Sequence, residues 1–177
     1  MTVMSNGFVL WLTGLSASGK STLATLVAKK IKERGKRVEI LDGDVIRQNL
    51  TKDLGFTKTD RKINLERITF VAKLLSRNDV ATIVSFISPY ISSRDSARQE
   101  TTNFIEVFVK CPVEVCIKRD PKGLYKKAIA GTIKNFTGIS HPYEDPLNPE
   151  ITVETDKESE EESAQKIFDY LASNNFA

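Results

Sequence analysis

Eight consecutive residues decide how the chain is interpreted: Gly14-Leu15-Ser16-Ala17-Ser18-Gly19-Lys20-Ser21. They match the pattern G-x-x-x-x-G-K-[ST] in full, and they lie between an apolar run typical of a strand and a stretch with helical periodicity. In that setting Gly14 and Gly19 allow a tight turn whose backbone N–H groups point inward, and the start of the helix adds its positive end. We therefore predict that residues Gly14 to Thr22 bind phosphate oxygens.

The chemistry of this loop indicates a nucleotide. We expect Lys20 to reach the β- and γ-phosphates and the Ser21 hydroxyl to ligate Mg²⁺, so a purine nucleoside triphosphate with magnesium is the predicted ligand. A guanine-nucleotide switch is disfavoured because its only candidate base-reading string, Thr57-Lys58-Thr59-Asp60, follows Leu54-Gly55-Phe56 rather than a strand. The D-x-x-G string at Asp120–Gly123 also comes after this candidate string, which is the wrong order for a switch protein.

Strand-like and helix-like stretches alternate along the chain. Five short apolar runs indicate buried strands: Phe8–Leu12, Val38–Leu41, Ala81–Ile87, Phe104–Val109 and Ile151–Glu154. Apolar residues at helical spacing lie in Leu23–Ile31 and Ile63–Leu75; Gly35 marks the end of the first helix, and Ser159 with Glu162 forms a possible capping box for the last. The alternation predicts an α/β fold of the P-loop NTPase type, a parallel sheet with helices on both faces and ligands at the carboxyl ends of the strands.

Length and composition indicate one folded domain over residues 1–177. Hydrophobic residues make up 40% and charged residues 28% of the chain, and the basic residues behind its net charge of +3 are scattered. We therefore expect no nucleic-acid and no membrane partner.

The start, MTVMSNGFVLWLTG, lacks a basic region and turns glycine-rich after a short apolar run, unlike a secretion signal or a membrane span. Cys111 and Cys116 fit reduced, buried thiols of a cytoplasmic protein, and a single histidine, His141, argues against a zinc site.

One long stretch breaks the alternation. Residues 120–149 carry three glycines and four prolines, and an unstructured connection of this length is usually a functional lid or a linker. A linker is the simpler interpretation. However, Tyr125, Phe136 and Tyr143 make the stretch too aromatic for a solvated spacer. We therefore predict a lid over a binding site.

Polar residues follow the second predicted strand, at the edge where parallel strands place ligands. There Asp42 and Asp44 could divide two tasks, one holding Mg²⁺ through water and the other orienting an attacking hydroxyl. A turn that caps a helix through Asp44 is the structural alternative. Arg47 can bind an anionic part of an acceptor bidentately. Arg61 and Asn64 share a helix face one strand away and could contact a second anion and a sugar or base edge.

The third apolar run ends in Phe86-Ile87-Ser88-Pro89-Tyr90, again at the predicted ligand edge. Ser88 is a candidate polar contact. By residue type alone, a turn residue before Pro89 is the simpler interpretation.

The ordered series of motifs resembles adenylyl-sulfate kinases over nearly the whole chain. The likeness covers GLSASGKST, DGDVIR, LGFTKTDRKINLERI, FISPY, CPVEVCIKRDPKGLYKKA, GTIKNFTGISHPYEDPLNPE and the final helix with ESA. Members of that family phosphorylate the 3′-hydroxyl of adenosine 5′-phosphosulfate with ATP and Mg²⁺. The resemblance implies the same activity here, in the stand-alone form and as a homodimer.

The resemblance also implies a set of site residues. The acceptor pocket would contain Asp44, Arg47, Phe56, Arg61, Asn64, Ile87 and Ser88, and the lid would add Lys122 and Phe136. The catalytic residues would be Lys20, Asp42, Asp44 and Ser88. Ser88 matches a serine described in the family as a phosphoserine intermediate, but direct in-line transfer needs no covalent step, so we expect it to position the acceptor. We further predict that Phe56 and Phe136 sandwich the acceptor's adenine.

Three positions depart from the family's usual pattern. Val45 replaces an asparagine, residues 63–68 replace an E-N-I-R-R-I string, and Ser140-His141 replaces an acidic pair. None of them removes a predicted site residue. A kinase of gluconate, shikimate or another small hydroxyl metabolite is the alternative enzyme, although such acceptors give no reason for Phe56 and Phe136. A nucleotide-binding module without transfer is the alternative outside the enzyme class.

Overall fold

The computed structural model describes residues 7–177. Residues 1–6, part of the stretch that the sequence analysis compared with a secretion signal, lie outside the described residues. Five parallel strands form one sheet in the order β2-β3-β1-β4-β5. They are β1 (Phe8–Thr13), β2 (Val38–Asp42), β3 (Ala81–Ser85), β4 (Phe104–Lys110) and β5 (Ile151–Glu154). Because β1 is the middle strand, the loop that follows it opens at the centre of the sheet's carboxyl edge.

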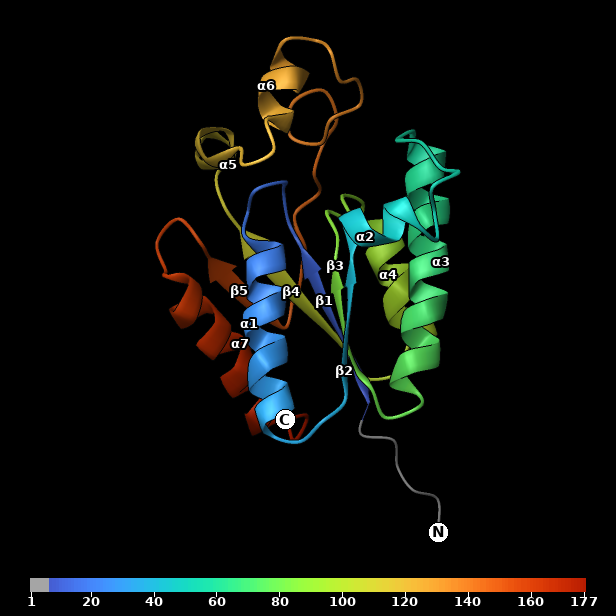
Figure 1. The fold of residues 1–177 in the computed structure, drawn as a ribbon, viewed down its shortest axis with the longest axis vertical. Coiled ribbons are helices and arrows are strands. Elements are labelled where there is room, and N and C mark those ends of the chain that lie inside the picture. Colours follow the sequence, from blue (N-terminus) through green and yellow to red (C-terminus); the bar gives the residue numbers. More distant parts are fainter. Residues whose placement is uncertain (1–6) are drawn as a thin grey trace.

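Helices cover both faces of this sheet (Figure 1). They are α1 (Lys20–Glu33), α2 (Gly43–Gln48), α3 (Lys58–Ser76), α4 (Ile91–Glu100), α5 (Val113–Arg119), α6 (Leu124–Ile129) and α7 (Glu160–Ser173). Helices α1 and α7 pack on one face, α3 and α4 on the other, and α6 lies beyond the strand ends at the top of Figure 1. The predicted α/β fold is confirmed. Within residues 7–177 no helix is long and apolar enough to span a bilayer.

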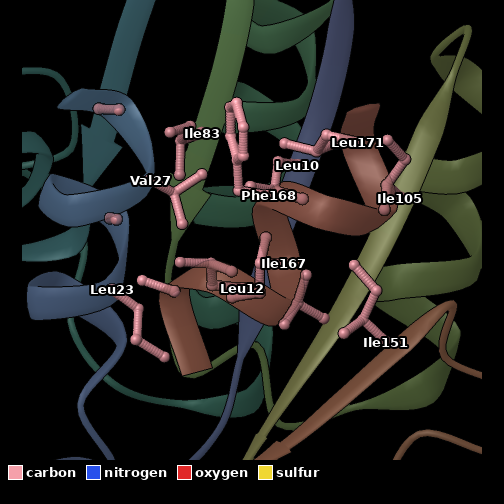
Figure 2. Packing of buried hydrophobic residues seen from close by; sticks show 14 of the residues in the cluster. Leu10, Leu12, Leu23, Val27, Ile83, Ile105, Ile151, Ile167, Phe168 and Leu171 are labelled. Atoms are coloured by element: carbon pink, nitrogen blue, oxygen red, sulfur yellow. The ribbon is translucent and has the colours of Figure 1, made fainter. Parts of the chain in front are cut away.

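Interleaved apolar side chains join the sheet to its helices. Figure 2 shows Leu10 and Ile83 of the sheet packed near Val27 of α1 and Ile167 of α7, and all four are fully buried. Each such burial stabilises the fold by roughly 1.5–3 kcal/mol. Trp11, the neighbour of Leu10, points to the opposite face, against α3 and α4. Burial on both faces explains why the strands are continuous apolar runs in the sequence.

Strand β3 is shorter than predicted: it ends at Ser85, whereas the apolar run continues to Ile87. The Thr13 hydroxyl donates to the Ile87 carbonyl oxygen at 2.7 Å, and Ser88 has a left-handed φ of 41°. The chain therefore leaves the sheet two residues early and forms a loop over residues 86–90. The other four strands agree with their predicted limits to within one residue.

The helix ends follow their capping chemistry. In the predicted capping box of α7, Ser159 Oγ accepts a hydrogen bond from the Glu162 N–H, and the Glu162 carboxylate accepts one from the Ser159 N–H. Gly35 lies just after α1 with φ 78°, as predicted. Thr57 and Asp60 form the same reciprocal box at the start of α3. The T-K-T-D string is therefore a helix start, which removes the remaining argument for a guanine-nucleotide switch.

Residues 120–149, named here the connecting segment, are more regular than predicted because they contain α6. Tyr125 and Ala128 of this helix pack with Cys111, Cys116 and Phe136 in a small apolar cluster of their own. This cluster buries one face of a six-residue helix and so stabilises it. The glycines and prolines around the helix hid its apolar pattern in the sequence. Both cysteines are free and buried, as predicted.

Candidate active site

A cleft of about 840 Å³ opens at the carboxyl ends of the strands, in the upper part of the usual range for small-molecule sites. Predicted site residues from five parts of the chain line it: Ser16, Ala17, Gly19, Lys20, Ser21, Thr22, Asp42, Asp44, Arg47, Phe56, Arg61, Asn64, Ile87, Ser88, Lys122 and Phe136. Gly14, Leu15 and Ser18 are not among its lining residues. The structure thus brings the predicted phosphate and acceptor residues to one space.

The loop before α1 has the backbone that its motif requires. A Cβ at Gly14 would lie 2.5 Å from the Val109 carbonyl oxygen, so no side chain fits there. Gly19 has φ 100°, a conformation that L side chains rarely adopt. Both glycines are therefore needed for the path that turns the loop's N–H groups toward a phosphate.

Two hydroxyl groups from distant segments hold the same loop. Thr155 Oγ1 donates to the Ser18 carbonyl oxygen at 2.8 Å, between residues 137 positions apart. Tyr125 Oη donates to the Ser16 carbonyl oxygen at 2.9 Å, between residues 109 positions apart. Arg119 donates to the Thr155 carbonyl oxygen at 2.5 Å. Arg119 and Thr155 also line the cleft but were not predicted. Arg119 lies within the string CPVEVCIKRDPKGLYKKA, which could have drawn attention to it, whereas Thr155 lies outside the strings that carry the family resemblance.

The Lys20 side chain folds back onto the loop. Its ammonium donates to the carbonyl oxygens of Gly14 at 2.9 Å and Leu15 at 2.6 Å. Burial lowers the pKa of Lys20 to about 8, and the nearby Asp42 carboxylate offsets only part of this effect. The ammonium also donates to Ser18 Oγ at 3.4 Å, and within residues 7–177 it forms no ion pair, so it is well placed to gain a phosphate as its counter-charge.

Ser21 and Asp42 form the oxygen pair predicted for Mg²⁺. Ser21 Oγ donates to Asp42 Oδ2 at 2.7 Å, and Asp42 Oδ1 accepts the Asp44 N–H at 3.0 Å. The cap of α2 is thus Asp42 and not Asp44, which corrects the structural alternative considered for this turn. A hydroxyl and a carboxylate oxygen beside a phosphate loop are ligands that suit Mg²⁺, so these residues fit the metal.

Arg47 and Arg61 converge on Phe56. Their guanidinium carbons lie 4.3 and 5.8 Å from its ring centroid. Arg47 donates to the Gly55 carbonyl oxygen at 2.9 Å, and Arg61 donates to the Asn135 carbonyl oxygen in the connecting segment at 2.6 Å. Burial lowers the pKa of both arginines, which stay charged. Within residues 7–177 neither forms an ion pair, so together they suit an anionic group.

The connecting segment reaches the cleft at two points. The Lys122 ammonium contacts the Asp44 carboxylate. Phe136 is buried and packs edge-on against Tyr125, with 5.0 Å between ring centroids and 76° between planes. Phe56, which lines the same cleft, is 54% exposed. Phe136 therefore has a packing contact as well as a place in the cleft, and the adenine sandwich stays a prediction.

Ser88 is held from two sides. Trp11 Nε1 donates to its Oγ at 3.0 Å, and Arg94 Nη1 donates to its carbonyl oxygen at 2.6 Å. The residue is 3% exposed and lines the cleft from the loop over residues 86–90. These contacts hold both its backbone and its hydroxyl in place, and its positioning role stays a prediction.

Comparison with known proteins identifies the family of this chain. A model of the family described as Adenylylsulphate kinase matches residues 6–154 of this chain. The chain belongs to the adenylylsulphate kinase family. This confirms the resemblance that the ordered motifs indicated.

Relatives of the family match over most of their length. A probable adenylyl-sulfate kinase of Pseudomonas aeruginosa is 64% identical over 91% of this chain and 75% of that protein. An adenylyl-sulfate kinase of Halothermothrix orenii is 57% identical over 93% of this chain and 89% of that protein. The structure of the Mycobacterium tuberculosis APS kinase CysC in complex with AMPPNP and APS has a TM-score of 0.91 and 44% identity, and it covers 94% of this chain and 98% of that chain.

One buried ion pair in this adenylylsulphate kinase chain was not predicted. Arg94 Nε lies 2.8 Å from Glu106 Oε1, with side chains 2% and 9% exposed, and Arg94 also donates to the Glu144 carbonyl oxygen at 2.7 Å. Through Arg94 the pair contacts the Ser88 carbonyl oxygen and joins α4, β4 and the connecting segment. A signal existed in the sequence, because Glu106 is an acid within the apolar run Phe104–Val109 and a buried acid requires a partner.

Proposed function

We propose that the protein transfers the γ-phosphoryl group of ATP to the 3′-hydroxyl of adenosine 5′-phosphosulfate, giving 3′-phosphoadenosine 5′-phosphosulfate and ADP. The observation that carries this proposal is the single cleft that joins the phosphate loop to the Arg47 and Arg61 pair. Relatives named adenylyl-sulfate kinases and an APS kinase solved with AMPPNP and APS support it.

On the phosphate side, residues 14–22 bind the triphosphate through backbone N–H groups and through Lys20. Ser21 and Asp42 would hold Mg²⁺, which when bound neutralises charge on the β- and γ-phosphates. Phosphate oxygens near Lys20 favour its protonated form, so nucleotide binding opposes the effect of burial on its pKa.

On the acceptor side, Arg47 and Arg61 bind the phosphosulfate group through charge-assisted hydrogen bonds. Asn64 is 3% exposed, and its Oδ1 has no hydrogen-bond partner within residues 7–177, so it is free to accept one from the acceptor. Phe56 and Phe136 contact the adenine. This set explains a preference for an acceptor with both an anionic group and a flat base.

At the junction of the two sides, Asp44 orients the attacking hydroxyl and accepts its proton, while Lys122 holds the connecting segment over the cleft. Ser88 positions the acceptor. A serine nucleophile needs an adjacent base, but among residues 7–177 the hydrogen-bond partners of Ser88 Oγ are the Trp11 indole, which donates to it, and the Phe86 carbonyl oxygen. Direct transfer between two bound substrates requires no such base.

Isolation of the product tests this function. Purified protein with ATP, Mg²⁺ and adenosine 5′-phosphosulfate should release ADP and the 3′-phosphorylated product in equal amounts, as measured by chromatography and mass spectrometry. Gluconate and shikimate should give no ADP above background, and a Lys20→Met preparation controls for contaminating kinases. ADP release without the phosphorylated nucleotide, or equal release with the other acceptors, would contradict the assignment.

We further propose a single functional domain over residues 1–177, with the connecting segment as its lid, that works as a homodimer in the cytoplasm. Two free, buried thiols fit a reducing compartment. A related APS kinase from Thiobacillus denitrificans is hexameric, so self-association occurs among related chains. Light scattering on the purified protein tests the dimer, and a monomeric mass at micromolar concentration would contradict it.

A further inference from the structure

Ser85, the last residue of β3, carries a buried hydroxyl that nothing in the fold satisfies. The residue is 3% exposed, and its Oγ has no hydrogen-bond partner within residues 7–177. A buried hydroxyl without a partner is destabilising, so its presence needs a reason. The need to fill space does not explain the serine, because an alanine at position 85 would fill nearly the same volume without a buried polar atom.

The sheet register places Ser85 beside the phosphate site. Its partners are Asp42 on β2 and Leu12 on β1, just before the phosphate loop. Ile83 and Ile40, two residues before Ser85 and Asp42, both pack on the face covered by α1. Side chains two residues apart in a strand point to the same face. Ser85 and Asp42 therefore lie next to each other on the α1 face, and both line the cleft.

The same face carries the residues that fit the metal. Ser21, the second residue of α1, donates to Asp42, and Lys20 precedes it. Magnesium bound to a nucleotide keeps several of its waters, and such waters are held by hydrogen bonds to nearby protein oxygens. A hydroxyl one strand away from Asp42 is at the right place for such a contact.

We propose that Ser85 Oγ is a further contact of the phosphate and metal site, accepting a hydrogen bond from a water of the Mg²⁺ that accompanies the nucleotide. This inference rests on the proposed function, because it assumes that Ser21 and Asp42 hold that metal. Ser85 is then a positioning residue: it acts on the metal through a water and touches neither the acceptor nor the transferred group. Its burial without a protein partner follows from its role, since the partner arrives with the nucleotide.

Calorimetry of nucleotide binding tests the inference without turnover. The affinity for AMPPNP is measured with excess Mg²⁺ and again with EDTA, and the ratio of the two affinities gives the contribution of the metal. We expect Ser85→Ala to lower this ratio by about three- to ten-fold, the usual effect of one hydrogen bond, entirely through weaker binding with Mg²⁺. The melting temperature of the ligand-free variant should equal or exceed that of the wild type, because an unsatisfied hydroxyl is removed.

A matched control lies on the same strand. Thr82 is fully buried, and it lies two residues before Val84, which packs on the face covered by α3 and α4. Thr82→Val should therefore leave the ratio unchanged. An unchanged ratio in Ser85→Ala would overturn the inference, as would equal loss of affinity with and without metal together with a lower melting temperature. A wild-type protein that binds AMPPNP equally well with Mg²⁺ and EDTA would instead contradict the metal site of the proposed function.

Discussion

The two halves of the cleft are built in opposite ways. The phosphate half comes from one continuous stretch, residues 14–22, together with Asp42 at the end of β2. The acceptor half is gathered from α2, from the loop that holds Phe56, from α3, from the loop over residues 86–90 and from the connecting segment, through contacts such as Arg61 to the Asn135 carbonyl oxygen. In the first half, the turn between β1 and α1 and the start of α1 supply all of residues 14–22, and Thr155 and Tyr125 hold the backbone of that turn. In the second half, the connecting segment itself supplies Lys122 and Phe136 to the cleft. Changes in the two halves should therefore affect different substrates.

The largest effect is expected in the phosphate half. Lys20→Met keeps the apolar stem and removes the charge, so turnover should fall by about 100- to 1,000-fold, the cost of losing one preorganised charge contact to the transition state. Steady-state ADP release measures the loss, and circular dichroism checks the fold. Lys29→Met, at an exposed position of the same helix, should be neutral. A folded Lys20 variant with near-normal turnover would show that the loop does not bind the transferred phosphate.

A second variant tests whether the acceptor half is separate. Arg61→Lys keeps the charge but loses the planar fork, so the Michaelis constant for adenosine 5′-phosphosulfate should rise about 10- to 100-fold while that for ATP changes little. Arg67→Lys on the same helix is the control, because Arg67 pairs with Asp53 on the surface. An equal rise for both substrates would mean that the two halves are not independent.

Phe136 tests whether the connecting segment contributes to acceptor binding. Stacking on one base is worth on the order of 1–3 kcal/mol, so Phe136→Ala should raise the acceptor's Michaelis constant by about ten-fold and leave that of ATP nearly unchanged. The melting temperature should fall as well, because Phe136 packs on Tyr125. Ile133→Ala, from the same apolar cluster, separates the two effects. Loss of stability in both variants with an unchanged acceptor constant would leave Phe136 only a packing role.

The smallest expected effect is on the free energy of unfolding, which burial of the Lys20 ammonium in the phosphate half should lower. Burial lowers the pKa of Lys20 from its ordinary 10.5 to about 8, so the unfolded chain binds more protons between these values. The cost of burying the ammonium is fully present below pH 8 and disappears as the pH rises toward 10.5. Lys20→Met should therefore be more stable than the wild type at pH 7, by on the order of 1 kcal/mol, and the difference should shrink at pH 10. Urea unfolding at both pH values measures it, and a constant difference would refute the burial effect.

The same contrast explains what the sequence could predict. The phosphate half is local, so its motif, its flanking strand and helix, and the roles of Gly14 and Gly19 follow from adjacent residues. The ends of strands place Asp42, Arg47 and Ser88 at one edge through topology alone. Such reasoning needs only the alternation of strands and helices and the rule that parallel strands end together.

Other features depend on contacts that no local pattern reports. The end of β3 was misplaced because Phe86 and Ile87 are apolar, and hydrophobicity does not reveal the left-handed residue that follows. Helix α6 was missed because it is stabilised by a cluster outside the main core. The hydrogen bond from Trp11 to Ser88 joins residues 77 positions apart, and both ends resemble ordinary core or turn residues in the sequence.

The central claim is that both halves of the cleft hold their substrates at once and that the phosphoryl group moves directly between them. ATP made chiral at its γ-phosphorus with oxygen isotopes tests this claim, because each in-line displacement inverts the configuration. The 3′-phosphoryl group of the product should carry the inverted configuration, as one transfer requires. Retention of configuration would show two transfers, and it would make Ser88 a covalent carrier rather than a positioning residue.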